Sequence, residues 1–107
     1  MDKPSFDRYY RYDELTEVLR TFVREFPALA QLESIGTSHE GRDIWALTVT
    51  SAATGPALDK PGFYVDGNIH GSEVTASMTA LYFAWKLLSG HGADAEITRL
   101  VDENSCY

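Results

Sequence analysis

A short apolar run followed at once by a long helical pattern constrains the fold more than any other feature. The run "FYV" at 63–65 is followed by "DGNIHGSE", and a helix is predicted from about Ser72. A run this short and rich in aromatic and β-branched residues is typical of a buried strand, which we expect to end at Asp66 or Gly67. Because a strand followed by a crossover helix normally returns to a parallel neighbour, this junction predicts an α/β fold.

The helical pattern after the junction places its apolar residues on one face. Gly90 fits the left-handed position that ends many helices. A shorter helix is predicted in "DAEITRLVDEN", with Asp94 as its N-cap, and "SCY" at 105–107 is typical of the start of another strand. The residues expected on the inner face of the long helix are Val74, Met78, Leu81, Tyr82, Trp85 and Leu88.

A helix and a β-hairpin are predicted before the junction. "YDELTEVLRTFVREFP" repeats apolar residues at spacings of three and four, so we expect a helix capped by Asp13 and ended by Pro27. The next stretch predicts a hairpin, roughly Gln31 to Ser38 paired with Asp43 to Thr50, around the turn "SHEGR". The following "SAATGPALDKPG" is predicted to be a loop.

These elements predict one mixed α/β domain that is incomplete. The 107 residues, of which 44% are hydrophobic, suffice for one core and are too few for two. The parallel partner that the junction requires is expected beyond Tyr107, so residues 1–107 are predicted to form a single partial domain, the N-terminal portion of a larger one. An unpaired sheet edge predicts self-association or strand exchange.

Charge and hydropathy argue against nucleic-acid and membrane partners, and the single cysteine excludes an internal disulfide. The formal net charge of −7 leaves no basic stripe for nucleic acid or an anionic membrane surface. No segment has the pattern of a secretory signal or a membrane span, so the expected location is the cytoplasm. Cys106 is the single cysteine, so no internal disulfide forms and a buried, inert thiol is expected.

His70 and Glu73 are the candidate metal ligands. They stand three residues apart just beyond the predicted strand, so an imidazole and a carboxylate can converge on one ion such as zinc. The pattern is not a zincin helix in either direction, because Val74 stands where an adjacent second histidine would be. A structural role explains the pair equally well, with His70 bonding the turn and Glu73 favouring the helix N-terminus. Spacing alone does not decide between a metal site and a polar turn.

The order of several motifs resembles the zinc carboxypeptidases of the carboxypeptidase A family. The resemblance rests on the segments "IGTSHEGRDIWALTVT" and "KPGFYVDGNIHGSEVTAS", and the similarity extends from about Tyr10 to Tyr107. The resemblance implies that His70 and Glu73 bind Zn²⁺ and that the substrate is a peptide or protein C-terminus. It also implies that the complete domain is a mixed-sheet, three-layer αβα zinc-peptidase (phosphorylase/hydrolase-like) fold.

The same resemblance places the remaining machinery outside this chain. It implies that the third zinc ligand, the general-base glutamate and the substrate-binding arginines lie downstream, so no catalytic residue is expected here and the isolated chain is expected to be inactive. Many digestive members have an arginine at the position of Ser72, so the extended substrate subsites are expected to differ. Two alternatives remain: a zinc deacylase resembling aspartoacylase or succinylglutamate desuccinylase, and a non-catalytic binding module on the same scaffold.

Structural roles are expected for the other candidate residues. His39 and His91 lie in predicted loops, where histidines are mostly solvated. Arg42 is expected to pair with a local carboxylate. Asp66 is expected either to orient His70 or to cap the turn before the helix. Packing of the first helix against the sheet is the expected role of Tyr9, Tyr10 and Tyr12.

Overall fold

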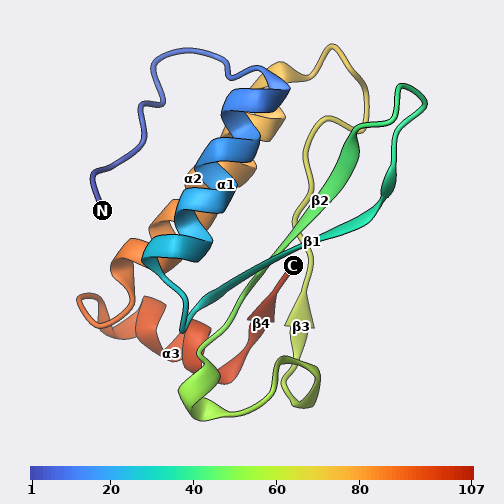
Figure 1. Cartoon of the computed structure of the whole chain (residues 1–107). Helices are drawn as coiled ribbons and strands as arrows, with labels where there is room; N and C mark the ends of the chain where they lie inside the picture. The colour runs from blue at the N-terminus through green and yellow to red at the C-terminus, as the bar shows by residue number, and fades with distance from the viewer.

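The computed structural model describes all residues, 1–107, as three helices on a four-stranded sheet (Figure 1). Two 3₁₀ turns, Ala52–Thr54 and Ala57–Asp59, lie in the loop after the hairpin. No helix is both long enough and apolar enough to cross a membrane. In chain order the elements are α1 (Tyr12–Glu25), β1 (Ala30–Thr37), β2 (Asp43–Val49), β3 (Gly62–Phe63), α2 (Val74–Gly90), α3 (Ala95–Glu103) and β4 (Ser105–Cys106).

The strands form a mixed sheet in the order β1-β2-β4-β3. β1 and β2 are antiparallel, with Leu32 opposite Leu47, which confirms the predicted hairpin. β4 is antiparallel to β2 and parallel to β3, with Phe63 opposite Cys106. The parallel partner required by the junction is therefore β4 itself, and the prediction that it lies beyond Tyr107 was wrong.

The apolar run at 63–65 is only partly a strand. β3 ends at Phe63, and Tyr64 is 74% exposed, so the predicted buried strand reaching Asp66 or Gly67 was wrong. β3 ends early because its partner strand β4 is short. The last hydrogen bond between the two segments is donated by the Val65 N–H to the Tyr107 carbonyl, at 2.8 Å. Beyond this bond the segment has no neighbouring strand, and it runs across the surface toward α2.

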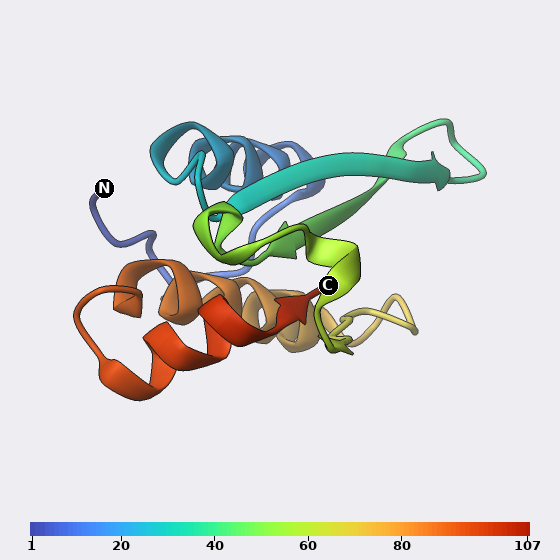
Figure 2. The same cartoon turned by 90° about the horizontal axis from the view of Figure 1, so that it is seen from below.

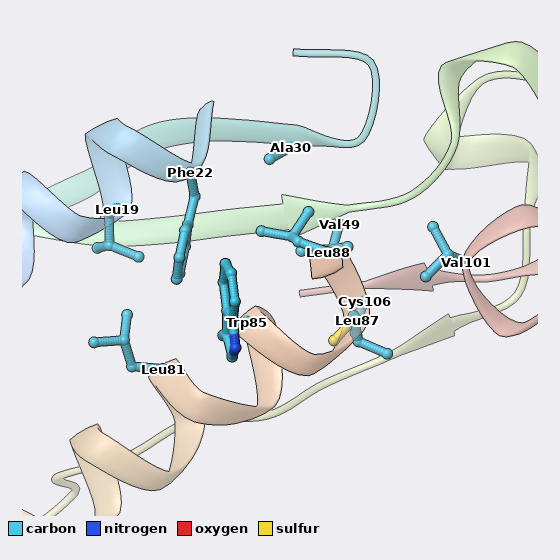
Figure 3. Close-up of a cluster of buried hydrophobic side chains, with 10 residues drawn as sticks. All are labelled: Leu19, Phe22, Ala30, Val49, Leu81, Trp85, Leu87, Leu88, Val101 and Cys106. Atoms are coloured by element: carbon cyan, nitrogen blue, oxygen red, sulfur yellow. The ribbon is translucent and has the colours of Figure 1, made fainter. Parts of the chain in front are cut away.

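One hydrophobic core joins the sheet to all three helices. Alternate residues of the hairpin point toward the helices, and Figure 2 shows the helices gathered on one side of the sheet. The Phe22 and Trp85 rings stack at the centre, with centroids 6.3 Å apart (Figure 3). The buried cluster consists of Leu19, Phe22, Ala30, Val49, Leu81, Trp85, Leu87, Leu88, Val101 and Cys106.

The ends of α2 differ from the sequence prediction. The helix begins at Val74, two residues later than expected, and Val74 and Tyr82 are partly exposed rather than inside. Gly90 is still helical, and the left-handed residue is Gly92, with φ 85°. A Cβ atom at Gly90 would lie 2.6 Å from Ile97 Cδ1, so the glycine permits close packing of α3 instead.

The predicted caps of the other helices had different outcomes. Asp94 caps α3 as predicted, since its side chain accepts hydrogen bonds from the N–H groups of Glu96 and Ile97. Asp13 does not cap α1, because the helix already begins at Tyr12. There the Glu14 carboxylate accepts the Arg11 N–H at 2.8 Å, and this bond holds the pKa of Glu14 below its ordinary value.

Candidate metal centre

The loop between β3 and α2 brings His70 and Glu73 together. His70 lies in a turn and Glu73 is the N-cap residue of α2. Glu73 Oε1 accepts the backbone N–H of His70 at 2.9 Å and lies 3.0 Å from His70 Nδ1. The two functional groups that the sequence singled out therefore converge at the surface, at the start of the long helix.

The donor set and the separation of these two groups suit zinc. Imidazole nitrogen and carboxylate oxygen are both common zinc ligands, and two ligand atoms at about 2.1 Å from a tetrahedral ion lie roughly 3.4 Å apart. The observed 3.0 Å thus requires an opening of a few tenths of an ångström. The His70 side chain is 77% exposed and that of Glu73 45%, so further ligands can approach from solvent.

These two residues supply only part of a coordination shell. Nowhere in the chain do three or more His, Cys, Asp or Glu side chains gather as a metal site would require. The structural role considered from the sequence is also present, because Glu73 accepts the His70 N–H. The metal role of His70 and Glu73 stays a prediction, and the geometry is compatible with it.

Neither predicted role of Asp66 is found. Its Oδ2 accepts a hydrogen bond from the Tyr64 hydroxyl at 2.9 Å, which raises the pKa of Tyr64, and it does not bond His70. The residue that holds the turn is Asn68, whose Oδ1 accepts the N–H and the hydroxyl of Ser77. Sequence reasoning missed Asn68; the Gly-Asn dipeptide just before a helix was the available signal.

The other two histidines lie apart from the metal loop. His39 is exposed in the hairpin turn, as expected. His91 is not solvated as expected: its side chain is 24% exposed, and its Nε2 lies 2.8 Å from Asp102 Oδ1. This contact links the end of α2 to α3, since close packing of the two helices brings an acidic side chain to the loop.

The remaining candidates have structural roles. Arg42 pairs at 2.6 Å with Glu40, two residues before it in the hairpin turn, as predicted. The Tyr12 hydroxyl donates to the Asp43 carbonyl and so joins α1 to β2, whereas the Tyr9 hydroxyl contacts that of Thr75 in α2 instead of the sheet.

Burial raises the pKa of the Cys106 thiol to about 11, which agrees with the expected inert side chain.

Known proteins match this chain over almost its whole length. Residues 15–107 match the zinc carboxypeptidase family model. Carboxypeptidase D of Mus musculus is 34% identical over 95% of the chain, and the inactive metallocarboxypeptidase ecm14 of Talaromyces marneffei is 30% identical over 92%. The structure of carboxypeptidase A from Helicoverpa armigera superposes with a TM-score of 0.82 at 26% identity, over 97% of the chain.

The matches confirm the α/β fold class and show how much of the relatives is represented. The chain spans 8% of carboxypeptidase D, 17% of the fungal protein and 24% of the Helicoverpa armigera structure. It corresponds to the N-terminal portion of the carboxypeptidase domain. With the family model covering most of the chain and several carboxypeptidases among its relatives, the chain belongs to the zinc carboxypeptidase family.

Proposed function

We propose that this chain is a single partial domain, the N-terminal part of a zinc-dependent metallocarboxypeptidase that removes the last residue of peptides or proteins. His70 and Glu73 hold the metal in this proposal. The observation that supports it is the 3.0 Å approach of His70 Nδ1 and Glu73 Oε1, within the segment that matches the family. Zinc itself follows from the family, and the two donors fit it.

The chain's own residues would hold the metal and leave the proton transfers to other groups. His70 would hold the metal through a ring nitrogen and Glu73 through its carboxylate, and a ring nitrogen that binds a metal carries no proton. Zinc, when bound, supplies an acidified water and polarises the scissile carbonyl. Since both His70 and Glu73 are occupied as ligands, the general base, the third ligand and the carboxylate-binding arginines are proposed to lie in the rest of the protein.

The test uses the protein with all the residues that its gene encodes after this segment. We expect it to release C-terminal residues from a panel of blocked dipeptides in a zinc-dependent manner. His70→Ala and Glu73→Gln should each lower kcat/KM by more than the roughly 10- to 100-fold typical of residues that merely support a metal site. His39→Ala, exposed in the hairpin turn, is the matched histidine control.

The isolated 107-residue chain provides a second test. With two ligands it should bind zinc weakly and hydrolyse no chromogenic peptide, because a preorganised site needs its full coordination shell. Clear turnover by this chain would show that the missing groups are not required. Absence of turnover by the complete protein, with zinc bound, would favour a different function.

A non-catalytic module on the same scaffold is the second candidate. The observation that favours it is the 30% identity to a relative described as an inactive metallocarboxypeptidase. A complete protein that binds zinc through His70 and Glu73 but cleaves neither peptides nor N-acyl amino acids would support this alternative. The carboxypeptidases among the relatives do not favour the deacylase alternative. A complete protein that cleaves N-acyl amino acids but no peptides would support that alternative.

A further inference from the structure

The first turn of α2 is capped differently from those of the other two helices. In α1 the N-cap carbonyl of Arg11 accepts the Leu15 N–H, and in α3 that of Asp94 accepts the Thr98 N–H, both at 2.9 Å. In α2 the Glu73 carbonyl accepts the Ala76 N–H, one residue earlier than this pattern. The Ser77 N–H therefore needs another acceptor, since a buried donor without one is costly.

Asn68 supplies that acceptor from outside the helix. Its Oδ1 accepts the Ser77 N–H at 3.1 Å and the Ser77 hydroxyl at 2.6 Å. Both residues are half-buried, so water does not readily replace these bonds. Asn68 is thus the effective cap of α2, although it stands six residues before the helix begins.

The backbone around Asn68 is built for this contact. Asn68 has φ 61°, and it is the one residue other than glycine with positive φ in the chain. Asparagine tolerates this left-handed conformation better than most residues. The preceding Gly67 passes so close to α2 that a Cβ atom there would lie 2.7 Å from the backbone carbon and oxygen of Ala76.

This arrangement changes what Glu73 can do. Serine, threonine, aspartate or asparagine at the N-cap uses its side chain to accept an N–H of the first helical turn. Glu73 makes no such capping bond, and its carboxylate instead accepts the His70 N–H and faces His70 Nδ1. Because Asn68 caps the helix, the carboxylate of Glu73 is free to meet the imidazole.

We propose that Asn68 is a positioning residue for the metal half-site: its side-chain amide caps α2 in place of Glu73 and so keeps the Glu73 carboxylate turned toward His70. The role in metal binding rests on the proposed function. The positioning itself concerns the geometry of the loop and is measurable without metal. The two statements can therefore fail separately.

The experiment follows the histidine rings of the full 107-residue chain by NMR, with and without Zn²⁺. Contacts between the His70 ring and the Glu73 side chain report the geometry, and zinc-dependent shifts of the His70 ring report affinity. His39 and His91 serve as internal references within each sample. The variants are Asn68→Ala, Asn68→Gly and Asn68→Asp. Asn104→Ala is the matched control, because it removes another amide that bonds a helix end, Leu100 in α3, away from His70.

We expect Asn68→Ala to lose the contacts between His70 and Glu73 and to weaken zinc binding by roughly 10- to 100-fold, as for other residues that orient metal ligands. Asn68→Gly should show the same losses, because it permits the left-handed backbone but has no acceptor. Asn68→Asp keeps an acceptor oxygen and should retain both the contacts between His70 and Glu73 and the zinc affinity of the original chain. Asn104→Ala should leave both unchanged, even where its melting temperature falls as far as that of Asn68→Ala.

Retention of the contacts between His70 and Glu73 in Asn68→Ala, or in Asn68→Gly, would overturn the proposed role of the amide. The same conclusion follows if Asn104→Ala disturbs the pair equally, because the effect would then be general loosening. If the unsubstituted chain shows no zinc-dependent shift at His70, these two ligands do not suffice to hold zinc in this chain. The contact measurement without metal still decides the role of Asn68 in that case.

Discussion

Gly67 lies where the loop before α2 passes closest to the helix backbone, and it offers a test of loop placement by steric means alone. A Cβ atom there would lie 2.7 Å from Ala76 backbone atoms, which cannot rotate away. We expect Gly67→Ala to lower the free energy of unfolding by about 1–3 kcal/mol, as overpacking does. Denaturant unfolding measures this change.

Gly71 is the matched control for that substitution. It also adjoins His70 and lies in the same loop, but a Cβ atom there would have nothing within 4 Å. Gly71→Ala should change the unfolding free energy by no more than about 0.5 kcal/mol, the usual range for surface substitutions. Equal effects of the two alanines would mean that the loop does not approach α2 as closely as the structure indicates.

Single residues of the candidate site were predictable where local spacing decides the geometry. His70 and Glu73 lie within reach of each other because three residues of turn return the chain to the same side. Asp66 was considered either to orient His70 or to cap the turn, and Asn68 caps it instead. Which side chain reaches the helix depends on the path of the loop over α2, and no spacing rule contains that path.

Among the elements, α3 allows the clearest energetic test of a prediction made from sequence. The Asp94 side chain accepts two N–H groups, from Glu96 at 2.9 Å and Ile97 at 3.0 Å. Asp94→Ala should cost about 1 kcal/mol of unfolding free energy, because both donors lose their partner. Asp94→Asn keeps the accepting oxygen and should remain within a few tenths of a kcal/mol of the original protein. Thermal or denaturant unfolding of the three proteins checks this, and an equal loss in both variants would point to the charge instead of the cap.

The elements themselves were predictable when their signals are local. Helical periodicity located α1 and α3 to within a few residues, and strand-like composition on both sides of a glycine turn located the hairpin. β3 and the end of α2 were misplaced because neighbours decide them. β3 ends where β4 no longer offers a partner. Ile97 packs so closely against Gly90 that a side chain would not fit there.

At the scale of the molecule, the helices cover one face of the sheet and much of the other face is bare (Figure 2). Ile35 is 66% exposed and Ile44 is 47% exposed, although both belong to strands. The α/β class was predictable from the order of the elements. The position of β4 between β2 and β3 was not, because pairing of a two-residue strand depends on contacts distant in sequence.

The two edges of the sheet differ in how well they resist pairing with another chain. The outer strand β1 carries the charged Glu33 and a register shift between Ser34 and Thr37, features that discourage edge pairing. The opposite edge is β3, which continues into Tyr64 and Val65 without a charge before Asp66. The backbone N–H and carbonyl of Tyr64 have no backbone partner. This edge is the expected site of self-association.

We therefore predict a concentration-dependent dimer of the 107-residue chain that pairs through the β3 edge, measurable by analytical ultracentrifugation. Tyr64→Pro should weaken dimerisation by about tenfold or more, because proline removes the unpaired N–H and fits an edge position of extended backbone. Tyr64→Ala is the control: it removes the same ring and hydroxyl but keeps the N–H, so it should still dimerise. A monomer at all concentrations would exclude pairing at this edge. Equal dimerisation of the proline and alanine variants would instead place the contact elsewhere, with the bare sheet face around Ile35 and Ile44 the next surface to substitute.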